Sequence, residues 1–206
     1  MAYNYESKDV WLINRSIDRS GARTVEVDVI GLDGSEISST SYEVETEANT
    51  SKRLKVIEGI EESVVFVRLV LRDGDEVLSR NVYWVAASND GLDWAESTWY
   101  HTPVTSFADY KALFSLDPAI VAVSSSARDG GAYAVTLENE STVPAFFVRL
   151  NLVDGEGEDV NPVTWSDNYV TLWPGETLEL SVRGWDEAGA KVLIDGANVE
   201  ASELSL

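Results

Sequence analysis

Apolar and polar residues alternate with a period of two along most of this chain. In the segment 24–29, three valines alternate with Thr24, Glu26 and Asp28. A period of two places the valines on one face of a β-strand, and that face is buried when the opposite face is polar. Asp-Gly and Pro-Gly dipeptides, which favour turns, separate segments of this kind. The pattern predicts strands in the segments 10–13, 24–29, 37–44, 54–56, 64–71, 77–85, 119–124, 132–138, 146–153, 160–165, 169–173, 178–182 and 191–194.

One stretch of sequence occurs twice. Residues 66–74 and 147–155 are identical at seven of nine positions, and both end in Asp-Gly. A repeat of strands and turns with this period indicates two copies of one small all-β domain, each of about a hundred residues. Within the repeat, Arg68 and Arg149 alternate with apolar neighbours, so we expect both arginines on outer faces, in surface ion pairs or in an interdomain contact rather than in ligand binding.

The repeat predicts an all-β fold of two tandem immunoglobulin-like antiparallel β-sandwiches joined by an aromatic-rich connector. We expect the first sandwich in residues 1–90, the connector in residues 91–117 and the second sandwich in residues 118–206. Ser106 and Asp109 have the spacing of a capping box, and the apolar residues that follow have near-helical spacing. The connector is therefore expected to contain a short helix.

Charge and composition exclude several classes of function. The chain has 36 acidic and 15 basic residues, a net charge of −21, so nucleic acid and anionic membranes are poor partners. It has no cysteine, which excludes disulfides and thiol chemistry. No signal-peptide pattern precedes the first strand, and we interpret the sequence as an excised fragment. The location of the parent protein stays open, with a secreted or periplasmic parent compatible with the sequence.

Large aromatic residues stand in a segment that otherwise resembles a loop. Trp94, Trp99 and Tyr100 belong to the connector, where no alternating pattern explains them. Aromatic side chains of this size usually contact an apolar surface or a ligand. Three interpretations remain: packing between the two sandwiches, contact with another domain, or a platform that stacks on sugars.

Several motifs occur in the order found in one enzyme family. The chain resembles the C-terminal region of glycoside hydrolase family 2, in its exo-β-D-glucosaminidase and β-mannosidase branch. Enzymes of this branch have a sugar-binding-like sandwich, an immunoglobulin-like sandwich and a (β/α)8 barrel before two further immunoglobulin-like sandwiches. The resemblance thus implies that the barrel is missing from this chain. The segments that carry it are Leu78-Ser-Arg-Asn-Val-Tyr-Trp84, Asp93-Trp-Ala-Glu-Ser-Thr-Trp-Tyr100, Ser106-Phe-Ala-Asp109, Trp165-Ser-Asp-Asn-Tyr169 and Pro174-Gly-Glu176.

The resemblance implies a non-catalytic accessory role. The carboxylate pair of a retaining β-glycosidase lies in the barrel, and no residue here corresponds to it. We interpret the acidic groups at residues 61–62 and 154–159 as surface charge, and His101 is the only histidine. No catalytic, cofactor-binding or metal-binding residue is predicted. The barrel of the parent enzyme is the implied partner, contacted by the candidate residues Trp94, Trp99, Tyr100, Trp165, Asp167, Asn168 and Tyr169.

Two alternatives from other functional classes remain open. The chain could be an independent carbohydrate-binding module for aminosugar polymers, because exposed indole rings stack on sugars and carboxylates attract aminosugar cations. An aminosugar oligosaccharide would then be its ligand. It could also be an immunoglobulin-like surface adhesion repeat, although a longer array and no aromatic connector would be expected of that class.

Overall fold

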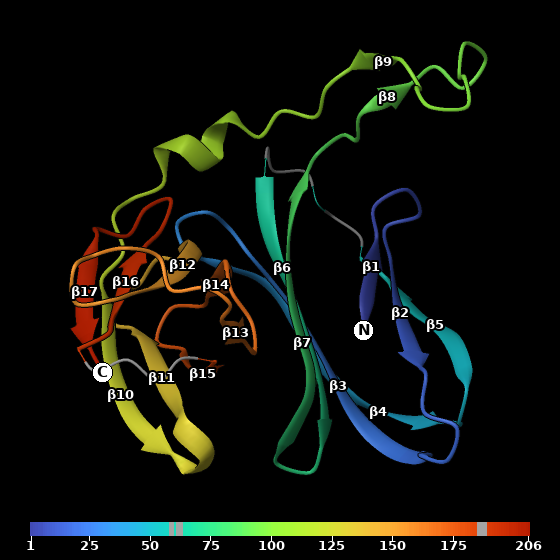
Figure 1. Cartoon of the computed structure of the whole chain (residues 1–206). Coiled ribbons are helices and arrows are strands. Elements are labelled where there is room, and N and C mark those ends of the chain that lie inside the picture. The colour runs from blue at the N-terminus through green and yellow to red at the C-terminus, as the bar shows by residue number, and fades with distance from the viewer. Residues whose placement is uncertain (58–59, 61–63, 185–188) are drawn as a thin grey trace. The chain divides into compact units, whose positions relative to one another are not determined.

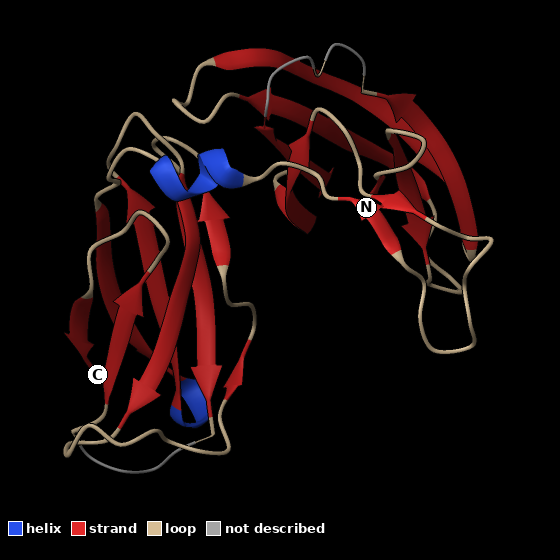
Figure 2. Cartoon of the chain, turned by 90° about the horizontal axis from the view of Figure 1, so that it is seen from above, coloured by secondary structure: helices blue, strands red, loops and turns tan. Residues whose placement is uncertain are grey.

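The computed structural model describes the whole chain except residues 58–59, 61–63 and 185–188 (Figure 1). The described residues form two compact units, Met1–Ser115 and Leu116–Leu206. The regular secondary structure of both units consists almost entirely of strands (Figure 2), and every pairing between the named strands is antiparallel. The predicted all-β fold with antiparallel sheets is confirmed.

The first unit contains a three-stranded and a four-stranded sheet. The smaller sheet has the order β1-β2-β5, formed by β1 (Ala2–Asn4), β2 (Asp9–Asn14) and β5 (Thr50–Val56). The larger sheet has the order β4-β3-β6-β7, formed by β4 (Glu36–Thr46), β3 (Gly21–Ile30), β6 (Val64–Asp73) and β7 (Glu76–Ala86). The three alternating valines of β3 are buried in the core between these sheets, together with Leu12 and Leu69.

The second unit contains two four-stranded sheets. One has the order β10-β11-β15-β13, formed by β10 (Val121–Arg128), β11 (Ala132–Asn139), β15 (Thr177–Arg183) and β13 (Thr164–Trp165). The other has the order β14-β12-β16-β17, formed by β14 (Val170–Leu172), β12 (Ala145–Val153), β16 (Lys191–Asp195) and β17 (Ser202–Ser205). A turn of 3-10 helix, η2 (Asp129–Gly131), joins β10 to β11. Leu137, Leu150 and Leu172 are buried in the core of this unit.

The repeated sequence forms a central strand in each unit, β6 and β12, with the predicted alternation. Leu69 and Leu150, which correspond in the repeat, both face a core. Arg68 lies opposite Asp28 of β3 and pairs with it at 2.8 Å. Arg149 likewise lies opposite Asp195 of β16 and pairs with it at 2.5 Å. Both arginines therefore form cross-strand ion pairs on the face away from the core, which is one of the two arrangements expected from the sequence.

The connector contains more regular structure than its sequence indicates. Two short strands, β8 (Gly91–Leu92) and β9 (Val104–Ser106), pair into a hairpin, and η1 (Lys111–Ser115) follows as a turn of 3-10 helix. The capping box proposed at Ser106 is wrong, because this residue belongs to β9. The helix instead begins beside Asp109, whose side chain accepts a hydrogen bond from the amide of Lys111 at 3.0 Å. The terminal strands β1 and β17 are also absent from the sequence-based prediction, because each is only three or four residues long.

Candidate functional site

The connector forms a hairpin, residues 90–108, that is closed at its base by backbone and side-chain hydrogen bonds. Asp90 accepts the amide of Ala108 at 2.7 Å, and Asp93 donates its amide to the carbonyl of Pro103 at 2.9 Å. At the tip, Thr98 donates its amide to the carbonyl of His101 at 2.7 Å. These bonds give the hairpin a defined shape although most of its side chains are exposed.

Three of the predicted site residues lie in this hairpin and are strongly exposed. The exposed fractions of their side chains are 72% for Trp94, 93% for Trp99 and 74% for Tyr100. The rings of Trp99 and Tyr100 contact each other edge to face, with centroids 4.9 Å apart. We call Trp99 and Tyr100 the aromatic tip, whereas Trp94 lies nearer the base of the hairpin, two residues after β8. Apolar surface of this extent typically indicates an interaction site.

The other four predicted residues lie in the second unit, Trp165 at the end of β13 and the other three between β13 and β14. Asn168 is chiefly structural, because its side chain accepts the amide of Leu150 and donates to the carbonyl of the same residue, both at 2.8 Å. Trp165 packs against the core of the unit. Asp167 is exposed and accepts the amide of Asn168 at 2.8 Å. Of these four residues, only Asp167 and Tyr169 are exposed, whereas Trp165 and Asn168 are partly buried.

Tyr169 is held in an unusual backbone conformation. Its φ is 54°, in the left-handed region, and the neighbouring Phe147 of β12 has a φ of 58°. Their rings lie 5.1 Å apart. The register of β12 shifts between Ala145 and Val148, so Phe147 lies in a β-bulge. A left-handed backbone conformation is costly for a residue with a side chain of this size. At Tyr169 it is stabilised by the two hydrogen bonds between the preceding residue, Asn168, and Leu150.

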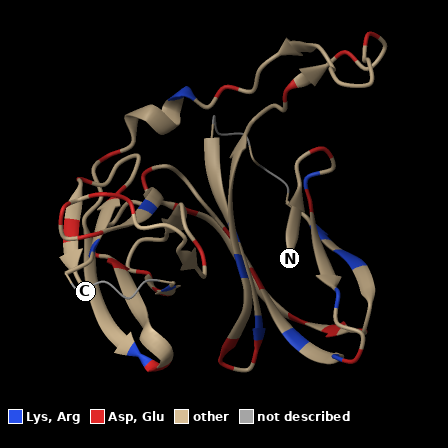
Figure 3. Cartoon of the chain, viewed as in Figure 1, with Lys and Arg blue, Asp and Glu red and all other residues tan. Residues whose placement is uncertain are grey.

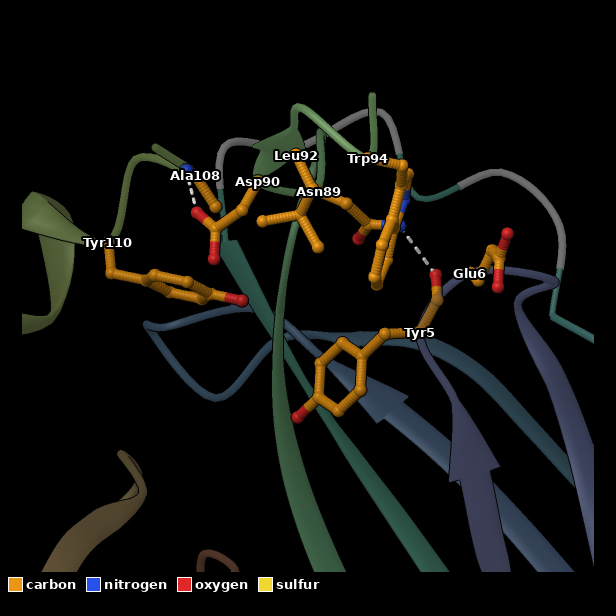
Figure 4. Close-up of a pocket in the computed structure, with 8 residues that line it drawn as sticks. All are labelled: Tyr5, Glu6, Asn89, Asp90, Leu92, Trp94, Ala108 and Tyr110. Atoms are coloured by element: carbon orange, nitrogen blue, oxygen red, sulfur yellow. Dashed lines mark hydrogen bonds between the residues drawn. The ribbon is translucent and has the colours of Figure 1, made fainter. Parts of the chain in front are cut away.

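A pocket of about 460 Å³ lies beside the base of the hairpin, within the first unit (Figure 4). Asn89 donates its side-chain amide to the carbonyl of Tyr5 at 2.7 Å, which ties the hairpin to the chain after β1. Sequence reasoning identified only Trp94 among the lining residues, because the two segments that form the walls lie more than eighty positions apart. The pocket is lined by Tyr5, Glu6, Asn89, Asp90, Leu92, Trp94, Ala108 and Tyr110.

The phenol of Tyr5 is a neutral group in this pocket. Burial, and then the proximity of Tyr110, Tyr83 and Tyr3, raises the pKa of Tyr5 to about 12. Its hydroxyl donates to the carbonyl of Trp84 at 3.3 Å. Tyr5 therefore keeps its proton at physiological pH, so it contributes an aromatic wall and no charge.

The acidic groups considered in the sequence form no cluster suited to metal binding among the residues that the structure describes. The segment 154–159 is a hairpin turn in which the carboxylate of Asp154 accepts the amides of Glu156 and Glu158. These backbone bonds hold the pKa of Asp154 below its usual value. Glu61 and Glu62 lie outside the described residues. In the described part of the chain, no helix has the length and apolar character of a membrane span.

Two antiparallel sandwiches with a hairpin connector define a tandem immunoglobulin-like protein. Residues 6–88 match the model of the mannosidase Ig/CBM-like domain, and residues 99–199 match that of the exo-β-D-glucosaminidase Ig-fold domain. The chain belongs to the immunoglobulin-fold domains of the exo-β-D-glucosaminidases, within glycoside hydrolase family 2. The resemblance to the C-terminal region of glycoside hydrolase family 2 enzymes, identified in the sequence, is confirmed.

Curated relatives and solved structures agree with this assignment. The exo-β-D-glucosaminidase of Hypocrea jecorina is 48% identical over 220 residues, which cover 100% of this chain and 24% of the relative. That of Streptomyces avermitilis is 37% identical over 193 residues, covering 87% of this chain and 21% of the relative. The crystal structure of the exo-chitosanase CsxA from Amycolatopsis orientalis has 30% identity and a TM-score of 0.88, covering 100% of this chain and 26% of that one.

The chain thus spans about a quarter of the length of the curated relatives that it matches. The matched quarter consists of their immunoglobulin-fold accessory domains, and the catalytic domain is not contained in this chain. The chain therefore corresponds to the accessory region of these multidomain relatives, outside their catalytic domain.

Proposed function

We propose that this chain supports the catalytic barrel of a glycoside hydrolase and contacts that barrel through the aromatic tip. The exposure of Trp99, 93% of its side chain, is the observation that carries the proposal. An indole ring held at the end of a hydrogen-bonded hairpin is costly to leave in water, and a neighbouring domain would remove that cost. Tryptophan and tyrosine are also the residues that most often dominate interface energies.

The second unit offers a further contact of the same kind. Tyr169 and Phe147 form an exposed aromatic pair on strained backbone, and Asp167 stands beside them. Strain of this kind concentrates at functional positions. We therefore retain Asp167 and Tyr169 as proposed contact residues, and assign Trp165 and Asn168 the role of supporting them from within the unit.

A chimeric enzyme tests the docking proposal. In it, this chain replaces the matching 220 residues of the Hypocrea jecorina relative, to which it is 48% identical. We expect Trp99→Ala to lower the unfolding free energy of the chimera by about 2–4 kcal/mol, because it removes an interface anchor. In the chain alone the same substitution should change stability by less than about 0.5 kcal/mol, because the ring is exposed there. Thermal and denaturant unfolding measure both values.

A matched control is available in the first unit. Ile17 is an apolar residue outside the connector whose side chain is 86% exposed, and Ile17→Ala should be neutral in both contexts. The docking proposal is wrong if Trp99→Ala behaves like Ile17→Ala in the chimera. A large loss of stability in the chain alone would instead show that Trp99 packs within the accessory domains.

The second candidate function is binding of an aminosugar oligosaccharide, favoured by the aromatic and acidic lining of the pocket beside the hairpin. The relatives are named as exo-β-D-glucosaminidases, so aminosugar polymers are the relevant class of ligand. We expect chitosan oligosaccharides to bind this chain saturably, with affinity that persists at high salt. High salt is essential because any polycation associates with a chain of net charge −21, and that attraction is screened. Calorimetric titration at low and high salt decides between specific binding and attraction of opposite charges alone.

A further inference from the structure

The pocket beside the hairpin has a defined shape. One wall comes from Tyr5 and Glu6, directly after β1, and the other from the connector between Asn89 and Tyr110. A hydrogen bond from Asn89 to the carbonyl of Tyr5 joins the two walls, and one from Ala108 to the carboxylate of Asp90 closes the connector wall. Figure 4 shows the rings of Tyr110 and Trp94 on opposite sides of the space, with Tyr5 below them.

Several polar groups at this pocket have no partner among the residues that the structure describes. Asp90 uses one carboxylate oxygen to accept the amide of Ala108, and its second oxygen makes no hydrogen bond or ion pair. The carboxylate of Glu6 is likewise unpaired, as are the indole N–H of Trp94 and the hydroxyl of Tyr110. Figure 4 shows this hydroxyl directed into the pocket. The site therefore offers two acceptors with negative charge and two neutral donors between aromatic faces.

The charge around the pocket favours a cation. From residue 81 to residue 110 the chain contains no Lys or Arg, so the charged residues that Figure 3 colours along this segment are all acidic. Its four carboxylates are those of Asp90, Asp93, Glu96 and Asp109. No lining residue carries a positive charge. An anion or a phosphate would be repelled, whereas an ammonium group would gain from the carboxylates and from the aromatic faces.

We propose that this pocket binds the protonated amino group of an aminosugar ring. The carboxylate of Asp90 accepts hydrogen bonds from the ammonium group, and the indole of Trp94 covers the apolar face of the ring. The indole N–H and the Tyr110 hydroxyl donate to ring hydroxyls. A volume of about 460 Å³ lies within the range of pockets for small ligands. The proposal deepens the aminosugar-binding candidate function, on which it rests, because it assigns that function to one pocket and one recognised group.

Comparing the affinities of glucosamine and N-acetylglucosamine tests whether the pocket recognises the ammonium group, because the second sugar carries a neutral amide in its place. We expect glucosamine to shift the NMR signal of the Trp94 indole N–H saturably at high salt, with affinity about tenfold higher than that of N-acetylglucosamine. Equal affinity for the two sugars would overturn the proposal. So would the absence of any shift at the Trp94 indole.

Matched variants test whether the pocket is the site. We expect Trp94→Ala to weaken glucosamine binding at least tenfold and Asp90→Asn about threefold to tenfold, since asparagine keeps the acceptor for Ala108 but loses the charge. The controls are Trp99→Ala, which removes an indole from the same hairpin outside the pocket, and Asp75→Asn, which removes an exposed carboxylate of the first unit outside the connector. Both should leave affinity unchanged. Circular dichroism verifies folding, and Asp90→Asn remains informative if Trp94→Ala does not fold.

The outcomes separate this proposal from the function on which it rests. If chitosan oligosaccharides bind at high salt but Trp94→Ala and Trp99→Ala are equally affected, the candidate function stands and the assignment to the pocket is wrong. If neither glucosamine nor the oligosaccharides bind at high salt, both are wrong. Binding that depends on Trp94 and Asp90, and that prefers the ammonium form, supports both.

Discussion

Leu69→Ala and Leu150→Ala should each lower the unfolding free energy of the chain by about 2–5 kcal/mol. The two leucines occupy corresponding positions of the repeat, and their side chains are 0% and 2% exposed. Each packs in a different core, Leu69 in the first unit and Leu150 in the second. Loss of a buried leucine removes its transfer free energy and leaves a cavity that the surrounding strands fill only in part.

The double variant tests whether the cores are separate. The effects of Leu69→Ala and Leu150→Ala should add to within about 0.5 kcal/mol, because residues without shared partners act independently. Denaturant unfolding of the four proteins of this cycle provides the measurement. A coupling of more than about 1 kcal/mol would contradict two cores and would indicate one fused core. The exposed Ile17 again supplies a control, since Ile17→Ala should lie within about 0.5 kcal/mol of the parent.

Asn139→Ala should destabilise the second unit by about 2–4 kcal/mol, because it removes the centre of a buried hydrogen-bond network. The side chain of Asn139 is 0% exposed and donates to the carbonyls of Val143 and Trp173 at 2.8 and 3.0 Å. It also accepts the amide of Ser141 at 3.0 Å. Alanine would leave these backbone groups without partners in a site that water reaches poorly. Equilibrium unfolding in denaturant measures the loss.

Asn151→Ala is the matched control for this prediction. Asn151 lies in the same unit and makes one side-chain hydrogen bond near the surface, to Asp159 at 2.8 Å. Its removal should cost about 0.5 kcal/mol or less, because water replaces the lost partner. Equal losses for Asn139→Ala and Asn151→Ala would show that the network around Asn139 contributes no more than one surface bond.

The strands were predictable because their pattern depends on local chemistry. The valines of β3 alternate with polar residues, and the repeat places Leu69 and Leu150 in equivalent strands, so burial of one face follows directly from the period. The same alternation predicts that Arg68 and Arg149 lie on the outer faces of their sheets. It does not predict which acidic residues, Asp28 and Asp195, form ion pairs with them. Partners depend on register between strands, which a single sequence does not specify.

The candidate site was predictable only in part, for a related reason. Exposed aromatic residues in a segment without alternation indicated Trp94, Trp99 and Tyr100. The pocket escaped prediction because Tyr5 approaches the hairpin through the bond from Asn89, a contact between residues 84 positions apart. The β8–β9 pairing escaped as well, because strands of two and three residues carry too little pattern to identify.

The closed base of the hairpin has a consequence for how this region tolerates changes in length. The bond from Ala108 to Asp90 and the pairing of Gly91 with Ser106 bring the two ends of the excursion together. Residues inserted beyond that closure lengthen a loop whose ends stay fixed, and each doubling of such a loop costs only about 0.6 kcal/mol. A segment inserted between Ala95 and Thr102 should therefore leave the strands of both sandwiches in place, even where it displaces Trp99 and Tyr100 and disrupts the proposed contact with the barrel, so folding and docking can be separated by one insertion.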